Sequence, residues 1–198
     1  MNPARTASQE RLGVSFFDRS VHDAARDLIG CRLFHAGCGG TIVETESYER
    51  DDPACHAYAG LTARNEVLFG PPGRAYVYLS YGIHFLLNAV AEPEGEAAAV
   101  LIRALEPTAG LEEMRARRGG RSEQELCAGP GRLTEALGVG LDANGADLGT
   151  EPFLLLPREP DWAGAVLSGP RIGISKAVDR PWRFCAGDSR FVSRPRPA

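Results

Sequence analysis

The sequence predicts a single α+β domain (α/β in the broad sense) built around a β-sheet. The chain has 198 residues, of which 43% are hydrophobic, enough to bury roughly two-thirds of its unfolded surface in one core. Three consecutive segments, at 74–80, 83–90 and 97–105, have the composition of strands. Segments with helical patterning and capping residues lie on either side of them.

The N-terminal segment predicts an arm followed by a helix. Residues 1–10 are polar and lack periodicity, so we expect a flexible arm there and one domain over residues 11–198. Ser20 with Asp23 three residues later resembles a helix N-cap, and Gly30 ends the helix. The apolar face of this helix consists of Val21, Ala24, Ala25, Leu28 and Ile29.

Two strands and a long loop come next. The strands are expected over 31–34 and 40–48, joined by a glycine-rich turn. Prolines and glycines then interrupt any regular pattern over 49–73. A loop of this length in a small domain usually carries function.

The second half of the chain predicts short elements. Thr108 is expected to cap a helix that runs to Arg118, before Gly119-Gly120. A second helix is expected over 132–137. Three short strands follow, with turn-rich segments between them, over 153–156, 171–174 and 182–185.

Net charge and its distribution bear on the class of partner. A formal charge of −4 and a pI near 5.6 argue, taken alone, against a nucleic acid, because phosphate contacts come from clustered Lys and Arg. Residues 164–198, however, hold seven Lys or Arg against two Asp. Within them, 171–183 is a better candidate for nucleic-acid contacts than Arg194 and Arg196, whose neighbouring prolines keep that end extended.

Cysteine content and hydropathy indicate a cytoplasmic protein without a metal. Five scattered cysteines, an odd number, favour reduced thiols in a cytosol. Cys31, His35 and Cys38 raise the question of zinc, but no second pair supplies finger spacing, so we expect no metal and no cofactor. No stretch approaches the ~18 apolar residues of a membrane span, so we expect no membrane association.

Two glutamates on a predicted strand are the first candidates for chemistry. Alternation puts Glu44, Glu46 and Tyr48 on one face and Val43 and Thr45 on the other. One interpretation is an ordinary amphipathic strand with solvent-facing glutamates. Another is a carbohydrate hydrolase whose acid and base lie about 7 Å apart. A third is a single reactive carboxylate beside a Glu44 that makes a structural hydrogen bond or ion pair, since buried charge is paired.

A predicted hairpin tip is the second candidate. At Tyr81-Gly82 the chain must reverse, and Gly82 supplies the positive φ that a tight turn needs. A tyrosine there either folds back onto the core or stays exposed as a wedge for stacked bases. With a two-residue turn, Tyr78 and Asn88 would face opposite sides of the hairpin. If both line one pocket, the turn therefore has three residues or a bulge.

An ordered series of short blocks carries a family resemblance. The blocks are Arg11-Leu12-Gly13 with Phe16-Phe17, 42–48, His56, Arg64-Asn65, 76–82 with Asn88, 101–107, Leu126-Cys127 with Gly129-Pro130, and 171–173. Together, from about Arg11 to Ser193, they resemble the alkyladenine (3-methyladenine, or methylpurine) DNA glycosylases of the mammalian type, which bacteria also have. The resemblance implies a curved, largely antiparallel sheet, surrounding helices and a protruding hairpin that inserts into DNA.

The resemblance also implies roles for individual residues. Glu46 would be the general base that activates water for attack on C1′, and Arg103 would help to hold that water. Tyr48 and His56 on one side and Tyr78 on the other would sandwich the flipped base.

The same resemblance bears on three further positions and on one region. Tyr81 would fill the gap left in the duplex, and Asn88 would crowd the 2-amino group of guanine. His84 departs from the family, whose members tend to carry tyrosine there, and residues 138–168 resemble the family only loosely.

Basic residues are the candidates for contacts with the DNA backbone. Arg115, Arg118 and Arg132 are phosphate candidates, the last near a helix start; a solvated surface is the alternative for each. Lys176 is the only lysine in the chain. Because the resembled family uses water and not an amine as nucleophile, Lys176 is expected to contact phosphate or to be a surface charge.

The sequence thus predicts a monofunctional DNA-repair glycosylase that acts on double-stranded DNA as a monomer. It would flip alkylated or deaminated purines out of the duplex, among them 3-methyladenine, 7-methylguanine, hypoxanthine and ethenoadenine, and leave an abasic site. Two alternatives stay open: a lesion-binding module that flips bases without cleavage, in which Glu46 is dispensable, and the carbohydrate hydrolase that would use Glu44 and Glu46.

Overall fold

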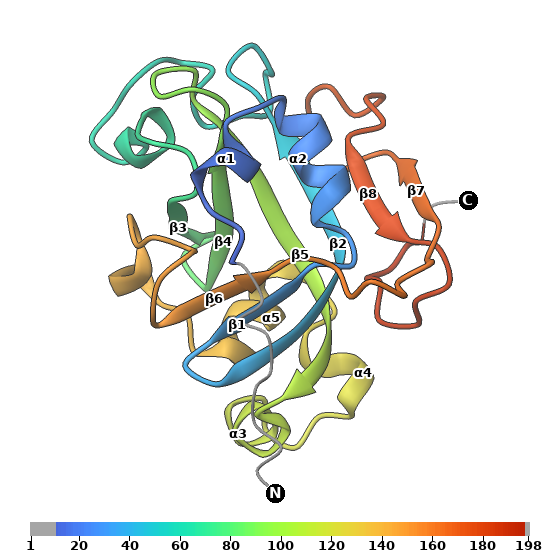
Figure 1. The fold of residues 1–198 in the computed structure, drawn as a ribbon. Helices are drawn as coiled ribbons and strands as arrows, with labels where there is room; N and C mark the ends of the chain where they lie inside the picture. Colours follow the sequence, from blue (N-terminus) through green and yellow to red (C-terminus); the bar gives the residue numbers. More distant parts are fainter. Residues whose placement is uncertain (1–10, 197–198) are drawn as a thin grey trace, which may run out of the picture.

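An antiparallel sheet of eight strands forms the centre of the molecule (Figure 1). The structure is a computed structural model that describes residues 11–196, so the arm expected over 1–10 lies outside the described residues. The strands are β1 (Arg32–His35), β2 (Cys38–Tyr48), β3 (Ala75–Ser80), β4 (His84–Ala91), β5 (Ala98–Ala109), β6 (Phe153–Leu156), β7 (Val166–Gly169) and β8 (Arg183–Ala186).

Strand β2 is the point at which the sheet branches. The strand order is β3-β4-β5-β2-β1-β6, and β8 joins β2 while β7 joins β8. One edge of β2 pairs with β5 along most of its length, whereas the other edge pairs first with β1, at 38–41, and then with β8, at 44–46. Register shifts between β2 and β5 around Glu44 accompany this branching. The sheet curls as a result, which confirms the predicted α+β fold with a curved antiparallel sheet.

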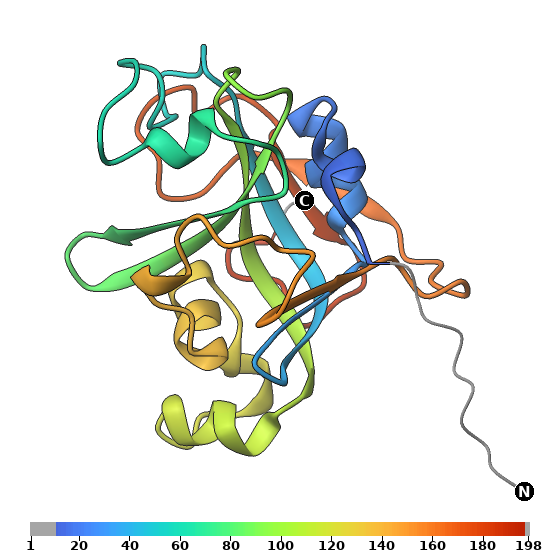
Figure 2. The same ribbon diagram turned by 60° about the vertical axis from the view of Figure 1, so that its left-hand side comes forward.

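Helices cover both faces of the curled sheet (Figure 2). Helix α2 (Val21–Leu28) packs against β2 and β5, and its N-cap Ser20 accepts a hydrogen bond from the Asp23 amide as the sequence predicted. Helix α5 (Pro130–Leu137) packs against β4 and β5, on the side from which the β3–β4 hairpin projects. The helices are α1 (Val14–Phe17), α2 (Val21–Leu28), α3 (Leu111–Arg117), α4 (Glu123–Leu126) and α5 (Pro130–Leu137), with 3-10 turns η1 (Glu66–Phe69) and η2 (Leu141–Ala143).

Two sequence predictions of local structure were wrong. Thr108 does not cap a helix, because β5 stays paired with β2 as far as Ala109, and Gly110, at φ +69°, makes the turn into α3. Residues 171–174 do not form a strand: the amide of Ile172 donates to the side chain of Glu46 instead of to a neighbouring strand. Helix α5 begins at Pro130, two residues earlier than expected. Proline suits the first position of a helix, because a backbone N–H there would have no acceptor within the helix.

The loop over 49–73 has an apolar core of its own. Its residues Cys55, Ala57 and Leu68 pack against Tyr76, Val90, Ala97 and Ala99 of the sheet region. The buried amide of Asn65 fixes the loop by donating to the carbonyls of His56 and Gly60 and accepting from Thr62. A long segment without strands is thereby held in one conformation. None of the helices within 11–196 is long and apolar enough to cross a membrane.

Candidate active site

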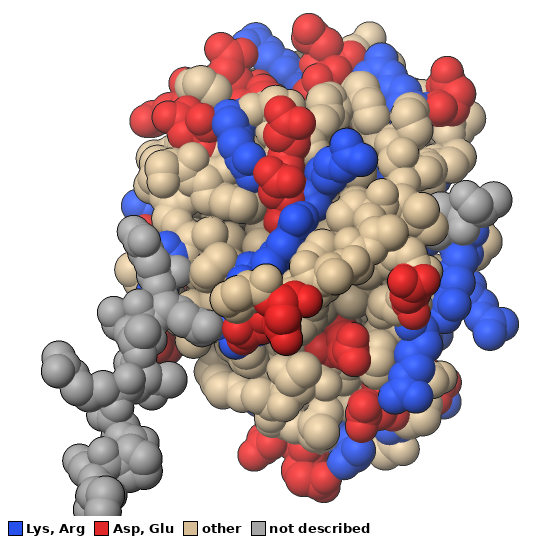
Figure 3. All heavy atoms as spheres, turned by 45° about the vertical axis from the view of Figure 1, so that its right-hand side comes forward, with Lys and Arg blue, Asp and Glu red and all other residues tan. Residues whose placement is uncertain are grey.

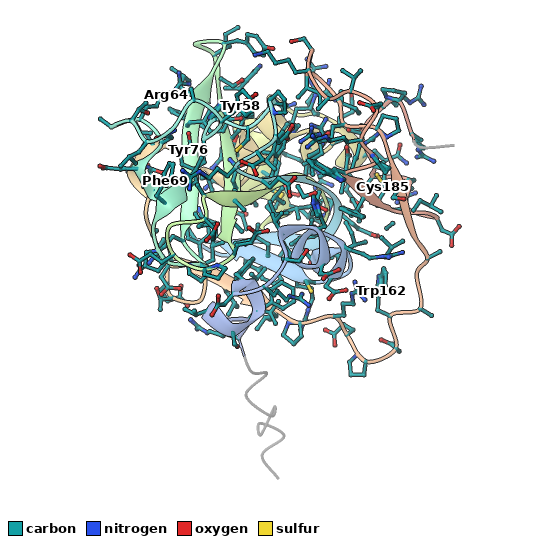
Figure 4. All side chains as sticks on the ribbon, turned by 90° about the horizontal axis from the view of Figure 1, so that it is seen from above. Tyr58, Arg64, Phe69, Tyr76, Trp162 and Cys185 are labelled. Atoms are coloured by element: carbon teal, nitrogen blue, oxygen red, sulfur yellow. The ribbon has the colours of Figure 1, made fainter. Side chains whose placement is uncertain are left out.

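A pocket of about 700 Å³ opens between the hairpin, the 49–73 loop and the start of α5. Segment 172–176 closes its remaining side. Figure 4 shows Tyr58, Arg64, Phe69 and Tyr76 grouped on the side of β3, away from Trp162 and Cys185. Of the residues predicted to form the site, those that line the pocket are Tyr48, His56, Tyr78, Tyr81, His84, Asn88, Arg103, Arg132 and Lys176.

Glu46 lies directly behind the pocket wall and is fully buried. One carboxylate oxygen accepts hydrogen bonds from Tyr48 Oη (2.7 Å) and Arg103 Nη1 (3.1 Å), and the other accepts from the Ile172 amide (2.7 Å). Burial raises the pKa of Glu46, and Arg103, Ile172 and Tyr48 offset this only in part. Three residues that line the pocket therefore hold a buried carboxylate with a raised pKa directly behind its wall.

Glu44, two residues earlier on the same strand, has a different environment. Its oxygens accept from Arg103 Nε (2.8 Å), Arg183 Nε (2.8 Å), the Ser193 amide (2.7 Å) and Ser193 Oγ (2.8 Å). Burial opposes its charge, but Arg103 and Arg183 together hold the pKa of Glu44 below its usual value. The structural ion pair predicted for Glu44 is thus confirmed, and the interpretation as solvent-facing glutamates is wrong.

Aromatic rings form one wall of the pocket. The rings of His56 and Tyr78 lie 4.4 Å apart at 63°, and those of Tyr76 and Tyr78 lie 5.3 Å apart at 34°. A hydrogen bond of 2.9 Å joins His56 Nδ1 to Tyr76 Oη. Rings at these separations are already in contact. The family resemblance implied a base held between Tyr48 and His56 on one side and Tyr78 on the other; in this structure the rings of His56 and Tyr78 contact each other.

The hairpin has a three-residue turn, one of the two geometries that the sequence argument allowed if Tyr78 and Asn88 line one pocket. Ser80 pairs with His84, so Tyr81, Gly82 and Ile83 form the turn. This register puts Tyr78 and Asn88 on the same face, and both line the pocket. Tyr81 has φ +50° and is 88% exposed. It does not fold back onto the core, which excludes that interpretation, and Figure 2 shows the hairpin projecting from the body.

The predicted basic residues fall into two groups. Arg132 and Lys176 line the pocket. Arg115 and Arg118, on or next to α3, lie outside the lining and form ion pairs with glutamates, Glu112 and Glu123 for the first and Glu135 for the second. Figure 3 shows basic and acidic side chains mixed across one face.

Two arginines of the 171–183 segment are buried, contrary to the expectation that they contact DNA. Arg171 is 5% exposed and pairs with Asp52; it also donates to the Ser47 carbonyl and lies between the rings of Tyr48 and Trp182, at 4.6 and 5.0 Å. Arg183 is 2% exposed and pairs with Glu44. Buried guanidinium groups that are already paired have no free face for phosphate.

Sequence reasoning missed several groups that build the site. The Ile172 amide, Asp52, Arg183 and Ser193 were not predicted, although Arg171-Ile172-Gly173 was among the matching blocks. Side-chain contacts between residues more than 100 positions apart leave no local pattern that would reveal them. Within 11–196 no group of three or more His, Cys, Asp or Glu residues is arranged to hold a metal ion.

Comparisons with known proteins show which family this chain resembles. Residues 15–190 match the family described as methylpurine-DNA glycosylase. A protein of Rhodopseudomonas palustris is 56% identical over 182 residues, covering 92% of this chain and 87% of its own. One from Nitrosospira multiformis is 55% identical, covering 90% and 92%, and one from Bradyrhizobium diazoefficiens is 51% identical over the full length of both. Each is named "Putative 3-methyladenine DNA glycosylase".

Together with the curled sheet and its aromatic pocket, these matches define the class of protein: it is a DNA glycosylase, an enzyme of DNA repair that acts on DNA. More specifically, the chain belongs to the methylpurine-DNA glycosylase family. Membership in this family sets aside the carbohydrate hydrolase and the non-cleaving module.

Proposed function

We propose that this enzyme removes 3-methyladenine and other alkylated or deaminated purines from double-stranded DNA by base extrusion and hydrolysis. The observation that carries the proposal is a buried carboxylate, Glu46, at the edge of an aromatic pocket beneath a protruding hairpin. The relatives named above support 3-methyladenine as the first substrate. 7-Methylguanine, hypoxanthine and ethenoadenine are proposed as further substrates.

Extrusion is required because the glycosidic bond cannot be reached inside the base stack. It costs a few kcal/mol, and an inserted side chain stabilises the gap that the base leaves. Tyr81, at 88% exposure on the hairpin turn, is available for that role. Arg132 and Lys176 at the pocket would hold phosphates beside the extruded nucleotide, with Arg115 and Arg118 as more distant candidates.

The pocket suits a purine with a positive charge or an electron-poor ring. Alkylation at N3 or N7 makes the base cationic, which strengthens its attraction to the faces of Tyr48 and Tyr78. Entry next to Tyr78 requires His56 and Tyr78 to separate, since their rings are 4.4 Å apart. Asn88 donates to the Tyr76 carbonyl (3.0 Å), which fixes its amide at the pocket wall. There it would crowd the 2-amino group of guanine and so favour adenine-derived lesions over 7-methylguanine.

Hydrolysis would use Glu46 as the base and Arg103 as the residue that helps to hold the water. In its ionised form Glu46 takes a proton from water as the water oxygen bonds to C1′ and the C1′–N bond breaks, and the purine departs with the bonding electrons. The products are a free base and an abasic site. A neutral purine such as hypoxanthine needs added hydrogen bonding to its departing ring. We propose that the enzyme acts as a monomer.

The test is a single-turnover incubation of the wild type, Glu46→Gln and Glu106→Gln with duplexes that carry hypoxanthine or ethenoadenine, followed by alkaline cleavage at abasic sites. Alkylated genomic DNA is assayed in parallel for released 3-methyladenine. Glu106, an exposed carboxylate on β5, provides the matched control. We expect release by the wild type and Glu106→Gln, strand breaks only after alkali, and a fall of about 10²–10⁴-fold for Glu46→Gln. Equal release by Glu46→Gln would refute the role of Glu46.

A further inference from the structure

The guanidinium of Arg103 is shared between two carboxylates. Its Nε donates to Glu44 at 2.8 Å and its Nη1 donates to Glu46 at 3.1 Å, while the side chain is 7% exposed and borders the pocket. A guanidinium is planar and rigid, so two hydrogen bonds to different partners fix both its position and its plane. The orientation of Arg103 toward Glu46 therefore depends on Glu44.

Glu44 is itself held from three directions. Arg103 approaches from β5, Arg183 from β8, and Ser193 from the segment after β8, with four hydrogen bonds of 2.7–2.8 Å in all. An ionised carboxylate accepts about four hydrogen bonds. Glu44 already accepts that number, three of them at Oε1. Of the residues that bond to Glu44 only Arg103 lines the pocket, whereas all three partners of Glu46 line it. Glu44 therefore reaches the substrate only through Arg103.

The segment that follows β8 completes this arrangement. Arg183 Nη1 donates to the Pro195 carbonyl (2.9 Å) and Nη2 to the Ser193 carbonyl (3.1 Å), while Nε donates to Glu44. Ser193 is 8% exposed, and both its amide and its hydroxyl donate hydrogen bonds to Glu44. Residues near the end of the sequence therefore reach the strand that carries Glu46.

We propose that Glu44, held by Arg183 and by Ser193, is a positioning residue that fixes Arg103 against Glu46. The inference rests on the proposed roles of Glu46 and Arg103 and extends them to three residues that never touch the substrate. It assigns a catalytic consequence to residues 193–195, which lie about 150 positions from Glu44 in the sequence.

Charge gives this role a signature that a merely structural ion pair lacks. The ionised side chains Glu44, Glu46, Arg103 and Arg183 balance one another. The other titratable groups around the two carboxylates are Tyr48, Tyr78 and Cys185. The negative charge of Glu44 raises the pKa of Glu46, so neutralising Glu44 lowers the pH at which Glu46 loses its proton. Loss of the hydrogen bond to Arg103 lowers the rate at the same time.

The experiment measures single-turnover base release against pH for the wild type, Glu44→Gln, Ser193→Ala and Thr45→Val, with thermal unfolding of each. Thr45 is the matched control, because it is a buried neighbour on β2 whose hydroxyl bonds the Ala25 carbonyl on the opposite face. We expect Glu44→Gln to lower the plateau rate roughly ten- to a hundredfold, less than loss of the base itself, and to shift the acid limb to lower pH. Ser193→Ala keeps the charge of Glu44 and should lower the plateau severalfold without moving the limb. Thr45→Val should change neither.

Each outcome separates this inference from the proposed function. A wild type active through Glu46, with Glu44→Gln folded and unchanged in both plateau and acid limb, overturns the positioning role alone. If Glu44→Gln does not fold, Ser193→Ala decides: a folded variant with a wild-type plateau overturns the role, and a severalfold fall supports it. A wild type that releases no base from any substrate overturns both proposals.

Discussion

The buried ion pair between Asp52 and Arg171 provides a sharp test of the energetics around the pocket. Both side chains are fully excluded from solvent. Asp52 accepts from both terminal nitrogens of Arg171 and from the Ala54 amide (3.1 Å). Asp52→Asn preserves the size of the side chain but leaves the guanidinium without its counter-charge. Removal of one partner from such a pair costs about 3–5 kcal/mol, against a total stability of roughly 5–15 kcal/mol for a domain.

The assay is urea unfolding at pH 7 of the wild type, Asp52→Asn and Glu112→Gln. Glu112 pairs with Arg115 at 2.6 Å on the surface, where its side chain is 84% exposed, so its loss should cost no more than about 0.5 kcal/mol. Asp52→Asn should also lower base release, because Arg171 holds the segment whose next residue, Ile172, bonds Glu46. A loss of stability below about 1 kcal/mol for Asp52→Asn would refute this account of the pair.

Three further predictions follow from the same geometry. Burial raises the pKa of Glu46 above 4.5, the ordinary value for glutamate, and the base must be ionised to act. Base release measured against pH should therefore fall as the pH drops through a midpoint above 4.5. A midpoint at or below 4.5 would contradict the buried environment assigned to Glu46. Tyr81→Gly relieves a positive φ worth about 1–2 kcal/mol but loosens the unfolded chain by about 0.5–1 kcal/mol. Calorimetry should therefore detect a stability change of at most about 1.5 kcal/mol, while base release from duplex DNA falls strongly. In Gly131→Ala the new Cβ would lie 2.8 Å from side-chain atoms of His84, so urea unfolding should detect a loss of about 1–3 kcal/mol in the free energy of unfolding. An unchanged urea midpoint would mean that the hairpin moves freely against α5.

Local patterns in the sequence predicted most of the secondary structure near the site. The alternation around Glu46, the cap at Ser20 and the strand composition on either side of Tyr81-Gly82 are short-range signals, and each corresponds to an element in the structure. For Tyr78 and Asn88 to line one pocket, the sequence required a three-residue turn or a bulge, because side-chain direction along a strand has a fixed period of two. The structure has the three-residue turn. The same local reasoning failed at Thr108, where pairing with β2 extended β5 beyond its local signal.

The sequence by itself determined which residue types are present and which face of β2 they share, since both follow from covalent order and backbone geometry. Only the tertiary structure decided that Glu44 and Glu46, on one face of one strand, have pKa values shifted in opposite directions. That difference depends on which partners come from β5, β8 and residues 172 and 193, all far away in the chain. Electrostatic interactions depend on distance in space and on burial, and neither quantity is encoded in the local order of residues.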